Sequence, residues 1–160
     1  MQHVNIYVES TWRGPRHTSG VYEFIMEVHM QPGQDPVTLT KHTELEDSTE
    51  NTSYVQAAAE AVNRLKSKCE VTFYTPNRFF NMAVNEYLPR WKNNGYLSAR
   101  GDLIANADEW QAIAQKTAAV RAEDRHHTYQ QCMRDDIRRL HLKINEKHHA
   151  EYPRTMCKIR

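Results

Sequence analysis

The segment YVQAAAEAVNRLKSKCEVTFYT, residues 54–75, joins a helical pattern directly to a strand pattern. Its apolar side chains recur at helical spacing, at Val55, Ala58, Ala59, Val62 and Leu65. Ser53 is a residue type that caps helices, so we expect a helix over about residues 54–66. Residues 70–75 (EVTFYT) then predict a short strand. A helix between two strands of one sheet is typical of a crossover that makes those strands parallel.

Three segments upstream alternate apolar with polar residues, as half-buried strands do. They are residues 3–9 (HVNIYVE), 20–30 (GVYEFIMEVHM) and 37–45 (VTLTKHTEL). The segments between them, residues 10–19 and 31–36, contain Gly and Pro and indicate turns. We therefore expect an antiparallel meander followed by a parallel fourth strand. The predicted architecture is α/β (α+β), a mixed sheet with helices packed on it.

The second half of the chain is expected to be mainly helical. A helix is predicted over residues 77–88, a turn at residues 92–95 (KNNG), and a further helix from about Asn106. Residues 118–148 fit either one long helix or a helix, a strand and a helix. We expect one domain over residues 1–140 and a basic C-terminal helix or tail over residues 141–160.

The composition fits a single folded domain but does not identify a ligand. The chain has 160 residues, of which 39% are hydrophobic and 26% charged, and its net charge is +1. A nucleic-acid-binding role must therefore rest on a local basic patch. The three cysteines, Cys69, Cys132 and Cys157, form no CxxC pair, so we expect reduced thiols. Since no signal peptide or membrane-spanning stretch is evident, we expect a cytoplasmic protein without membrane contact.

Five stretches, in this order, resemble the ribonuclease H family. They are VNIYVEST (residues 4–11), NTSYVQAAAEAVNRLK (51–66), FYTPN (73–77), FFNMAVNEYLPRWKNNGY (79–96) and IANADEW (104–110). In the family the corresponding features are an Asp-Gly-Ser step, an Asn and Glu before an Ala-rich helix, a Thr-Asp-Ser step, a helix ending in Trp-Lys-x-x-Gly, and an Asn-x-Asp-x-Trp element. The likeness is good over residues 48–110, fair over residues 3–45 and poor after residue 115.

The resemblance implies a two-Mg²⁺ hydrolysis of RNA–DNA hybrids in which four carboxylates hold the metal pair. Here the first carboxylate position is Glu9, one methylene longer than the usual Asp. The second falls on Tyr54, a neutral phenol at pH 7, and the third on Pro76, which has no ligand atom. The fourth falls on Asp136 or Asp135.

Other acids could replace the missing ligands in only a few ways. Glu46 and Glu50 precede the first helix and could swing in, whereas Glu60 should point elsewhere on that helix. Without such a replacement, the sequence predicts no metal site, and Mg²⁺ would be the cofactor only if the enzyme were active. Histidine-rich stretches at residues 126–127 and 148–149 lack zinc spacing.

The family positions that contact nucleic acid are better kept. The resemblance places Thr49, Asn51, Asn77, Trp91, Lys92 and Asn106 at positions that touch phosphate, RNA 2′-hydroxyl groups or the DNA strand. Each has a structural alternative, because Thr49 and Asn51 could cap a helix and Trp91 could be a core residue.

Three functions are consistent with these residues. The first is a catalytically impaired ribonuclease H-like domain that binds nucleic acid, with RNA–DNA hybrid or a double strand as the candidate ligand. The second is an active Mg²⁺-dependent hybrid ribonuclease with a rearranged site. The third is a scaffold that binds a protein through its basic C-terminal helix. Residues 111–135 are shorter than in the family and Ala118–Asp124 is helix-prone, so the fifth strand of the family is expected to be absent or vestigial.

Overall fold

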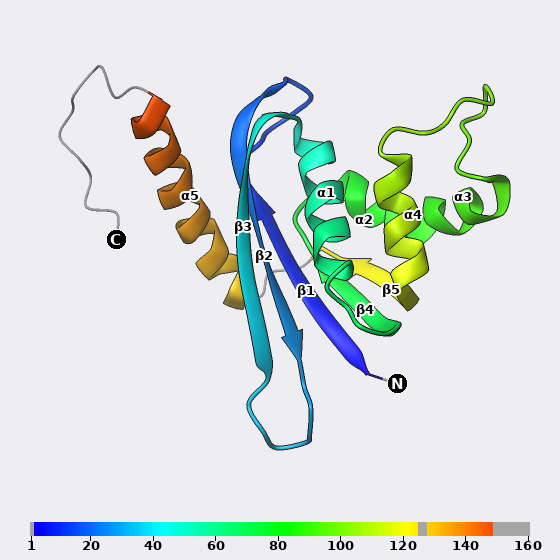
Figure 1. Ribbon diagram of the computed structural model, residues 1–160, viewed down its shortest axis with the longest axis horizontal. Coiled ribbons are helices and arrows are strands. Elements are labelled where there is room, and N and C mark those ends of the chain that lie inside the picture. The colour runs from blue at the N-terminus through cyan, green and yellow to red at the C-terminus, as the bar shows by residue number, and fades with distance from the viewer. Residues whose placement is uncertain (1, 125–127, 149–160) are drawn as a thin grey trace.

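The computed structural model describes residues 2–124 and 128–148, and they form one mixed sheet with helices on both faces (Figure 1). The strands are β1 (His3–Ser10), β2 (Thr18–Val28), β3 (Val37–Ser48), β4 (Cys69–Tyr74) and β5 (Thr117–Glu123). The helices are α1 (Glu50–Val62), α2 (Arg78–Met82), the π-helix η1 (Ala83–Tyr87), α3 (Leu88–Asn94), α4 (Ala107–Lys116) and α5 (Thr128–His148).

The order of strands in the sheet is β3-β2-β1-β4-β5. The pairs β3–β2 and β2–β1 are antiparallel, as the predicted meander requires, and β1–β4 is parallel, as the crossover through α1 requires. The predicted mixed α/β architecture is therefore confirmed. No helix in residues 2–124 or 128–148 has the length and apolar character needed to cross a membrane.

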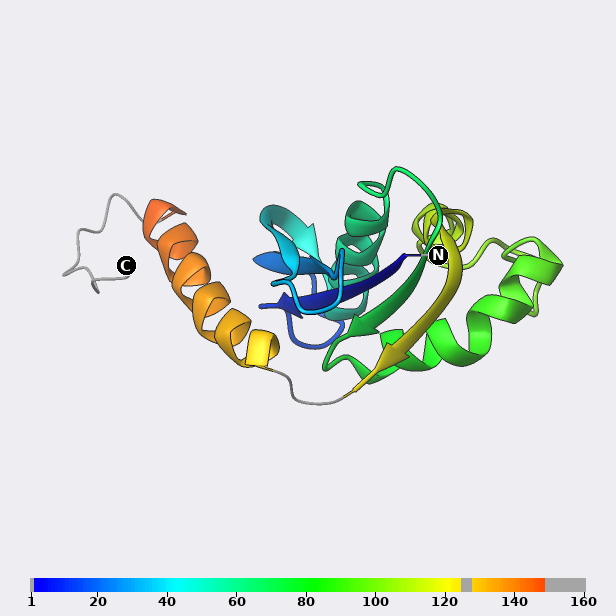
Figure 2. The same cartoon turned by 90° about the horizontal axis from the view of Figure 1, so that it is seen from below.

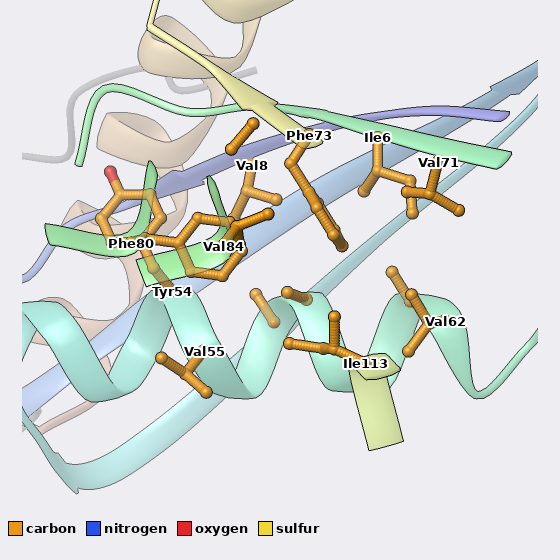
Figure 3. Packing of buried hydrophobic residues seen from close by; sticks show 14 of the residues in the cluster. Ile6, Val8, Tyr54, Val55, Val62, Val71, Phe73, Phe80, Val84 and Ile113 are labelled. Carbon is orange, nitrogen blue, oxygen red and sulfur yellow. The ribbon is translucent and has the colours of Figure 1, made fainter. Parts of the chain in front are cut away.

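The main core lies between the sheet and α1 to α4. Alternate residues of β1, namely Val4, Ile6 and Val8, face this core, while Tyr7 and Glu9 face the opposite side. Figure 3 shows side chains of α1 and α4 packed against those of β1 and β4. Trp110 is buried and stacked on Phe80, with ring centroids 5.5 Å apart, so it is a core residue.

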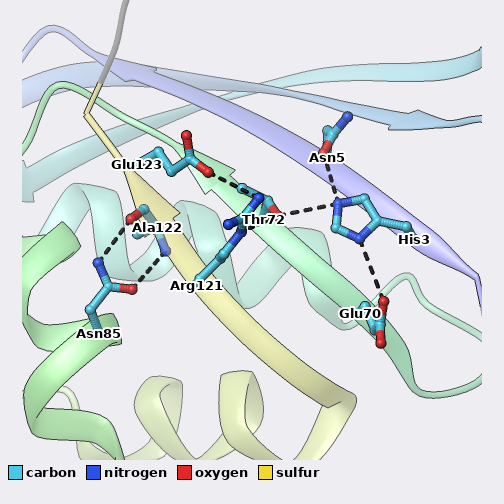
Figure 4. Close-up of polar contacts among 8 residues, drawn as sticks. All are labelled: His3, Asn5, Glu70, Thr72, Asn85, Arg121, Ala122 and Glu123. Atoms are coloured by element: carbon cyan, nitrogen blue, oxygen red, sulfur yellow. Dashed lines mark hydrogen bonds and ion pairs between the residues drawn. The ribbon is translucent and has the colours of Figure 1, made fainter.

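The other face of the sheet is contacted by α5 alone among the helices of the described residues. Met133 of α5 packs with Tyr7, Tyr74 and Ile25, and Ile137 packs on Val21. Figures 1 and 2 show α5 apart from the other helices, and its contacts with the sheet are mainly to β1 and β2. The part of this face that α5 does not cover, over β1, β4 and β5, is polar. There His3, Thr72 and Arg121 are joined by hydrogen bonds (Figure 4).

The expected absence of a fifth strand is wrong. Residues 117–123 form the seven-residue strand β5, which pairs in parallel with β4 from Thr117 opposite Cys69 to Glu123 opposite Tyr74. The side-chain amide of Asn85 binds the outer edge of β5 (Figure 4). It donates to the carbonyl of Ala122 at 2.8 Å and accepts from its N–H at 2.9 Å. Tertiary pairing thus outweighs the helix propensity of the alanines in this segment.

Two helix boundaries also differ from the sequence prediction. Thr49, rather than Ser53, is the N-cap of α1 and its hydroxyl oxygen accepts from the N–H of Thr52, so the helix begins four residues earlier than expected. The predicted turn at residues 92–95 is the end of α3, which continues to Asn94 and stops at Gly95 in the left-handed region, φ 76°. Cys69 is buried and Cys132 exposed, both as free thiols.

Candidate functional site

Glu9 lies near the end of β1 on the face contacted by α5, and only 1% of its surface is exposed. The hydroxyl of Tyr54 from α1 donates to one carboxylate oxygen, Oε1, at 3.4 Å. The Nε of Arg134 from α5 donates to the other, Oε2, at 3.2 Å and forms an ion pair with it. Both oxygens of this buried acid are therefore engaged by neighbouring side chains.

Two opposing effects act on the pKa of Glu9. Burial raises the pKa of Glu9, while the hydrogen bond and charge of Arg134, the charge of Arg13 and the Tyr54 hydroxyl act in the opposite direction. Burial and the negative charge of Glu9 raise the pKa of Tyr54 well above its usual range. Tyr54 is thus a neutral hydrogen-bond donor rather than an anionic ligand.

The positions expected for the other family carboxylates are occupied as follows. Tyr54 points at Glu9, so the second position does converge on the first, but with a phenol. Pro76 is half-buried two residues after the end of β4 and brings no ligand atom. Asp135 and Asp136 are both exposed on α5, and Asp136 pairs with Arg139 at 3.4 Å. On α5 the residue that reaches Glu9 is Arg134, a cation.

A second buried acid, Glu23 on β2, lies directly opposite Glu9 in the register of the sheet. Directly opposite residues in an antiparallel pair lie on the same face, roughly 5 Å apart at Cβ. Burial, with a smaller contribution from the charge of Asp136, raises the pKa of Glu23 to about 7. Its Oε2 is buried with no hydrogen-bond partner among the described residues.

The acids that precede or begin α1 do not replace the missing ligands at Glu9. Glu50 accepts from the N–H of Gly14 at 2.8 Å and from Nδ2 of Asn77 at 3.0 Å, so its carboxylate ties the β1–β2 loop to the start of α2. Glu46 is exposed on β3.

Among the residues that the structure describes, no three His, Cys, Asp or Glu side chains gather in a way that could hold a metal ion. His126, His127, His149 and Cys157 lie outside the described residues.

Four of the residues proposed to contact nucleic acid gather where α1, α2 and α4 begin. Thr49 caps α1, and Asn77 caps α2 by accepting from the N–H of Phe80. Nδ2 of Asn77 also donates to Oδ1 of Asn51 at 3.1 Å. Asn106, at the start of α4, donates to the hydroxyl of Thr52 at 3.3 Å. These side chains therefore cap helices and link them, and Asn51 is the exposed member of the group.

Trp91 and Lys92 are neighbours on α3, but their side chains line two different cavities. The ring of Trp91 is half-buried against Trp110, at 5.3 Å between centroids, which fits the alternative of a structural residue. Trp91 and Arg90 line a cavity at the end of α3, and Lys92 lines a separate one between α3 and β5. The guanidinium of Arg90 lies over the ring of Tyr87 at 5.2 Å. Adjacent positions in the sequence thus face two sides of the helix.

The comparison with known proteins agrees with this arrangement of strands and helices. A family model described as RNase H matches residues 2–127. The chain belongs to the RNase H family. A ribonuclease H of Francisella tularensis subsp. novicida is 36% identical over 67 residues, which are 42% of this chain and 44% of that protein. One from Francisella philomiragia subsp. philomiragia is 34% identical over the same share. The match thus spans less than half of these RNase H relatives.

Solved structures of RNases H share the fold. LC9-RNase H1, described as a type 1 RNase H with the type 2 active-site motif, superposes with a TM-score of 0.63 and 19% identity, covering 83% of this chain and 69% of that one. LC11-RNase H1, solved in complex with RNA/DNA hybrid, gives a TM-score of 0.51 and 12% identity, covering 84% and 92%.

Two residues beside Glu9 were missed by the sequence analysis of this RNase H-family chain. Arg134 precedes the aspartates that the family pattern suggested by one or two positions, and only the rotation of α5 decides which of these side chains meets Glu9. Glu23 occupies the inward-facing position of an alternating strand, where an acid is unusual. An acid at such a position could have marked Glu23 as unusual from the sequence. Only the register of β1 and β2 shows that Glu23 lies opposite Glu9.

Proposed function

We propose that this chain is an RNase H-family domain that binds nucleic acid, with RNA–DNA hybrid as the preferred candidate, and is impaired in two-metal hydrolysis. The observation that carries the proposal is the engagement of Glu9 by Arg134 and Tyr54. A Mg²⁺ pair needs several carboxylate oxygens in near-octahedral geometry. The side chains around Glu9 do not fit that requirement, because a guanidinium and a phenol take up its oxygens.

The binding half of the proposal is supported by the relatives and by retained polar groups. LC11-RNase H1 and a foamy viral protease–reverse transcriptase, which has a TM-score of 0.59 and 15% identity, were each solved with RNA/DNA hybrid. In this chain Asn51 and Lys92 are exposed, and the sequence resemblance assigns them to family positions that face the ligand. Contacts to phosphate and 2′-hydroxyl groups hold a hybrid without any need for cleavage.

The test measures cleavage and binding on the same purified protein. We expect no detectable hybrid cleavage with Mg²⁺ or Mn²⁺ and no ordered Mg²⁺ pair beside Glu9, because each metal ion contributes several kcal/mol to transition-state stabilisation and each ~1.4 kcal/mol is a factor of ten in rate. Hybrid affinity should survive Glu9→Ala, fall with rising salt, and weaken with Lys92→Ala. Lys68→Ala is the matched control, since Lys68 is exposed in the loop between α1 and β4.

One observation favours the alternative of an active enzyme with a rearranged site. Glu23 places a second buried carboxyl group opposite Glu9. If hybrid cleavage is found and is lost in both Glu9→Gln and Glu23→Gln, this alternative replaces the impaired domain. If the wild type shows neither cleavage nor salt-sensitive binding, a protein scaffold remains as the function.

A further inference from the structure

A cavity of about 350 Å³ lies between the β1–β2 loop and α5, directly beside Glu9. Its polar wall is formed by Glu9, Thr11, Arg13, Arg134, Arg138 and His141, and its apolar wall includes Ile137. Three arginines against one glutamate leave a surplus of two positive charges (3 − 1 = 2) with His141 neutral. In the family, carboxylates would make the corresponding site negative and suited to Mg²⁺. In this chain the side chains around the cavity carry a net positive charge instead.

We propose that this cavity binds a backbone phosphate of nucleic acid directly, through its arginines and without a divalent metal. The inference rests on the proposed nucleic-acid-binding function and assigns one contact within it. A phosphodiester carries one negative charge and acceptor oxygens, which match the forked donors of guanidinium groups. The arginines would thus take the place that metal ions hold in a hydrolytic site, binding phosphate without activating water.

The donors on the loop side are held in place by the backbone. Nη1 of Arg13 donates to the carbonyls of Ser10 and Trp12 at 2.6 and 2.7 Å, which leaves the other N–H groups of its guanidinium for a ligand. The hydroxyl oxygen of Thr11 accepts from the N–H of Val21 at 3.0 Å, so its own proton can be donated into the cavity. Gly20 permits this packing, because a Cβ there would lie 2.6 Å from the Thr11 hydroxyl oxygen.

The donors on the helix side come from successive turns of α5. Arg134 uses Nε for Glu9 and retains its terminal amino groups, and Arg138 follows one turn later on the same face. Nδ1 of His141 is buried and has no hydrogen-bond partner among the described residues. The nearby acids Asp136 and Glu23 oppose an anion only weakly, since Asp136 pairs with Arg139 and burial raises the pKa of Glu23 to about 7.

The experiment titrates a short fluorescein-labelled RNA–DNA hybrid in EDTA over a series of salt concentrations. Arg138→Gln is the test variant and Lys143→Gln the matched control, because each removes one positive charge from an exposed side chain on α5 and only Arg138 lines the cavity. We expect wild-type binding in EDTA, an affinity about tenfold lower for Arg138→Gln, and a slope of log K against log salt reduced by about one. Lys143→Gln should match the wild type in both quantities.

A second measurement distinguishes a backbone phosphate from a free one. Inorganic pyrophosphate is titrated while the ring signals of His141 are followed by NMR, and we expect shifts in the wild type that are lost in Arg138→Gln. If pyrophosphate shifts His141 while hybrid affinity is the same in wild type and Arg138→Gln, the site takes free phosphate and the inference is overturned.

The failure of this site and the failure of the proposed function give different results. If Lys92→Ala weakens hybrid binding and Arg138→Gln behaves like Lys143→Gln, the cavity is not a phosphate site while the proposed function stands. If the wild type shows no salt-sensitive binding at all, both are overturned.

Discussion

Single residues around Glu9 determine what this site can do. Arg134 supplies a positive charge from within the protein to an acid that is almost fully buried. Removing one partner of such a pair costs free energy because the other is left buried without compensation. Glu23, by contrast, has no cation as a partner among the described residues, and burial favours its neutral form. Burial raises the pKa of both opposite acids, but only at Glu9 do neighbouring cations oppose that effect.

The pH dependence of stability should carry the signature of Glu23. Burial raises its pKa from 4.5 to about 7, so between these values the folded state holds a proton that the unfolded state has lost. The free energy of unfolding should therefore fall as pH rises from about 4.5 through 7. In urea denaturation, Glu23→Gln should be more stable than the wild type at pH 8, by about 1–3 kcal/mol, and nearly equal to it near pH 4.5.

Glu46→Gln, at an exposed position of β3, is the control for this measurement. It retains every histidine, as Glu23→Gln does, so histidine titration cancels from the comparison. Parallel stability curves for wild type and Glu23→Gln between pH 4.5 and 8 would show that Glu23 is ionised normally.

At the scale of elements, β5 shows how a neighbouring segment stabilises a weak strand. Its sequence, TAAVRAE, contains three alanines, and alanine favours helices. The strand forms because β4 pairs with one edge and the amide of Asn85 pairs with the other. Asn85 reaches that edge from the π-helix η1, whose wider turn interrupts the α-helical run from α2 to α3.

Replacing Asn85 should loosen β5. Asn85→Ala removes two hydrogen bonds to Ala122, so we expect a loss of about 1–2 kcal/mol of stability and faster hydrogen exchange at the Ala122 amide. Glu86→Ala is the control, since Glu86 is exposed in the same π-helix. Equal exchange rates at Ala122 in the two variants would mean that Asn85 does not stabilise the strand.

At the scale of the whole molecule, the two faces of the sheet are packed very differently. The face toward α1 contains the large core, whereas α5 is held by two small groups of apolar contacts centred on Met133 and Ile137. Since stability within a protein varies with local packing, the α5 face should open more readily. The cavity beside Glu9 lies at this weaker interface.

Native-state hydrogen exchange should detect that difference. We expect the amides of α5 to exchange through a local opening of lower free energy than those of β1 and β4. Met133→Ala should speed exchange in α5, since loss of a fully buried methionine side chain costs about 2–5 kcal/mol, while β4 is less affected. Cys132→Ala, at the adjacent exposed position, should leave both unchanged. Uniform acceleration across α5 and β4 would indicate instead that the molecule opens as one unit.

The sequence alone determined the meander, the crossover through α1 and the parallel pairing of β1 with β4, because apolar periodicity and turn residues are local properties of the chain. By family resemblance it also predicts that Glu9, Tyr54 and Pro76 stand at three of the family's carboxylate positions. Only the tertiary structure decided that residues 117–123 form a strand, because the pairing partners that overcome their propensity lie far away in the chain. The meeting of Arg134 and Glu23 with Glu9 was likewise decided by helix rotation and strand register, which bring together side chains distant in sequence.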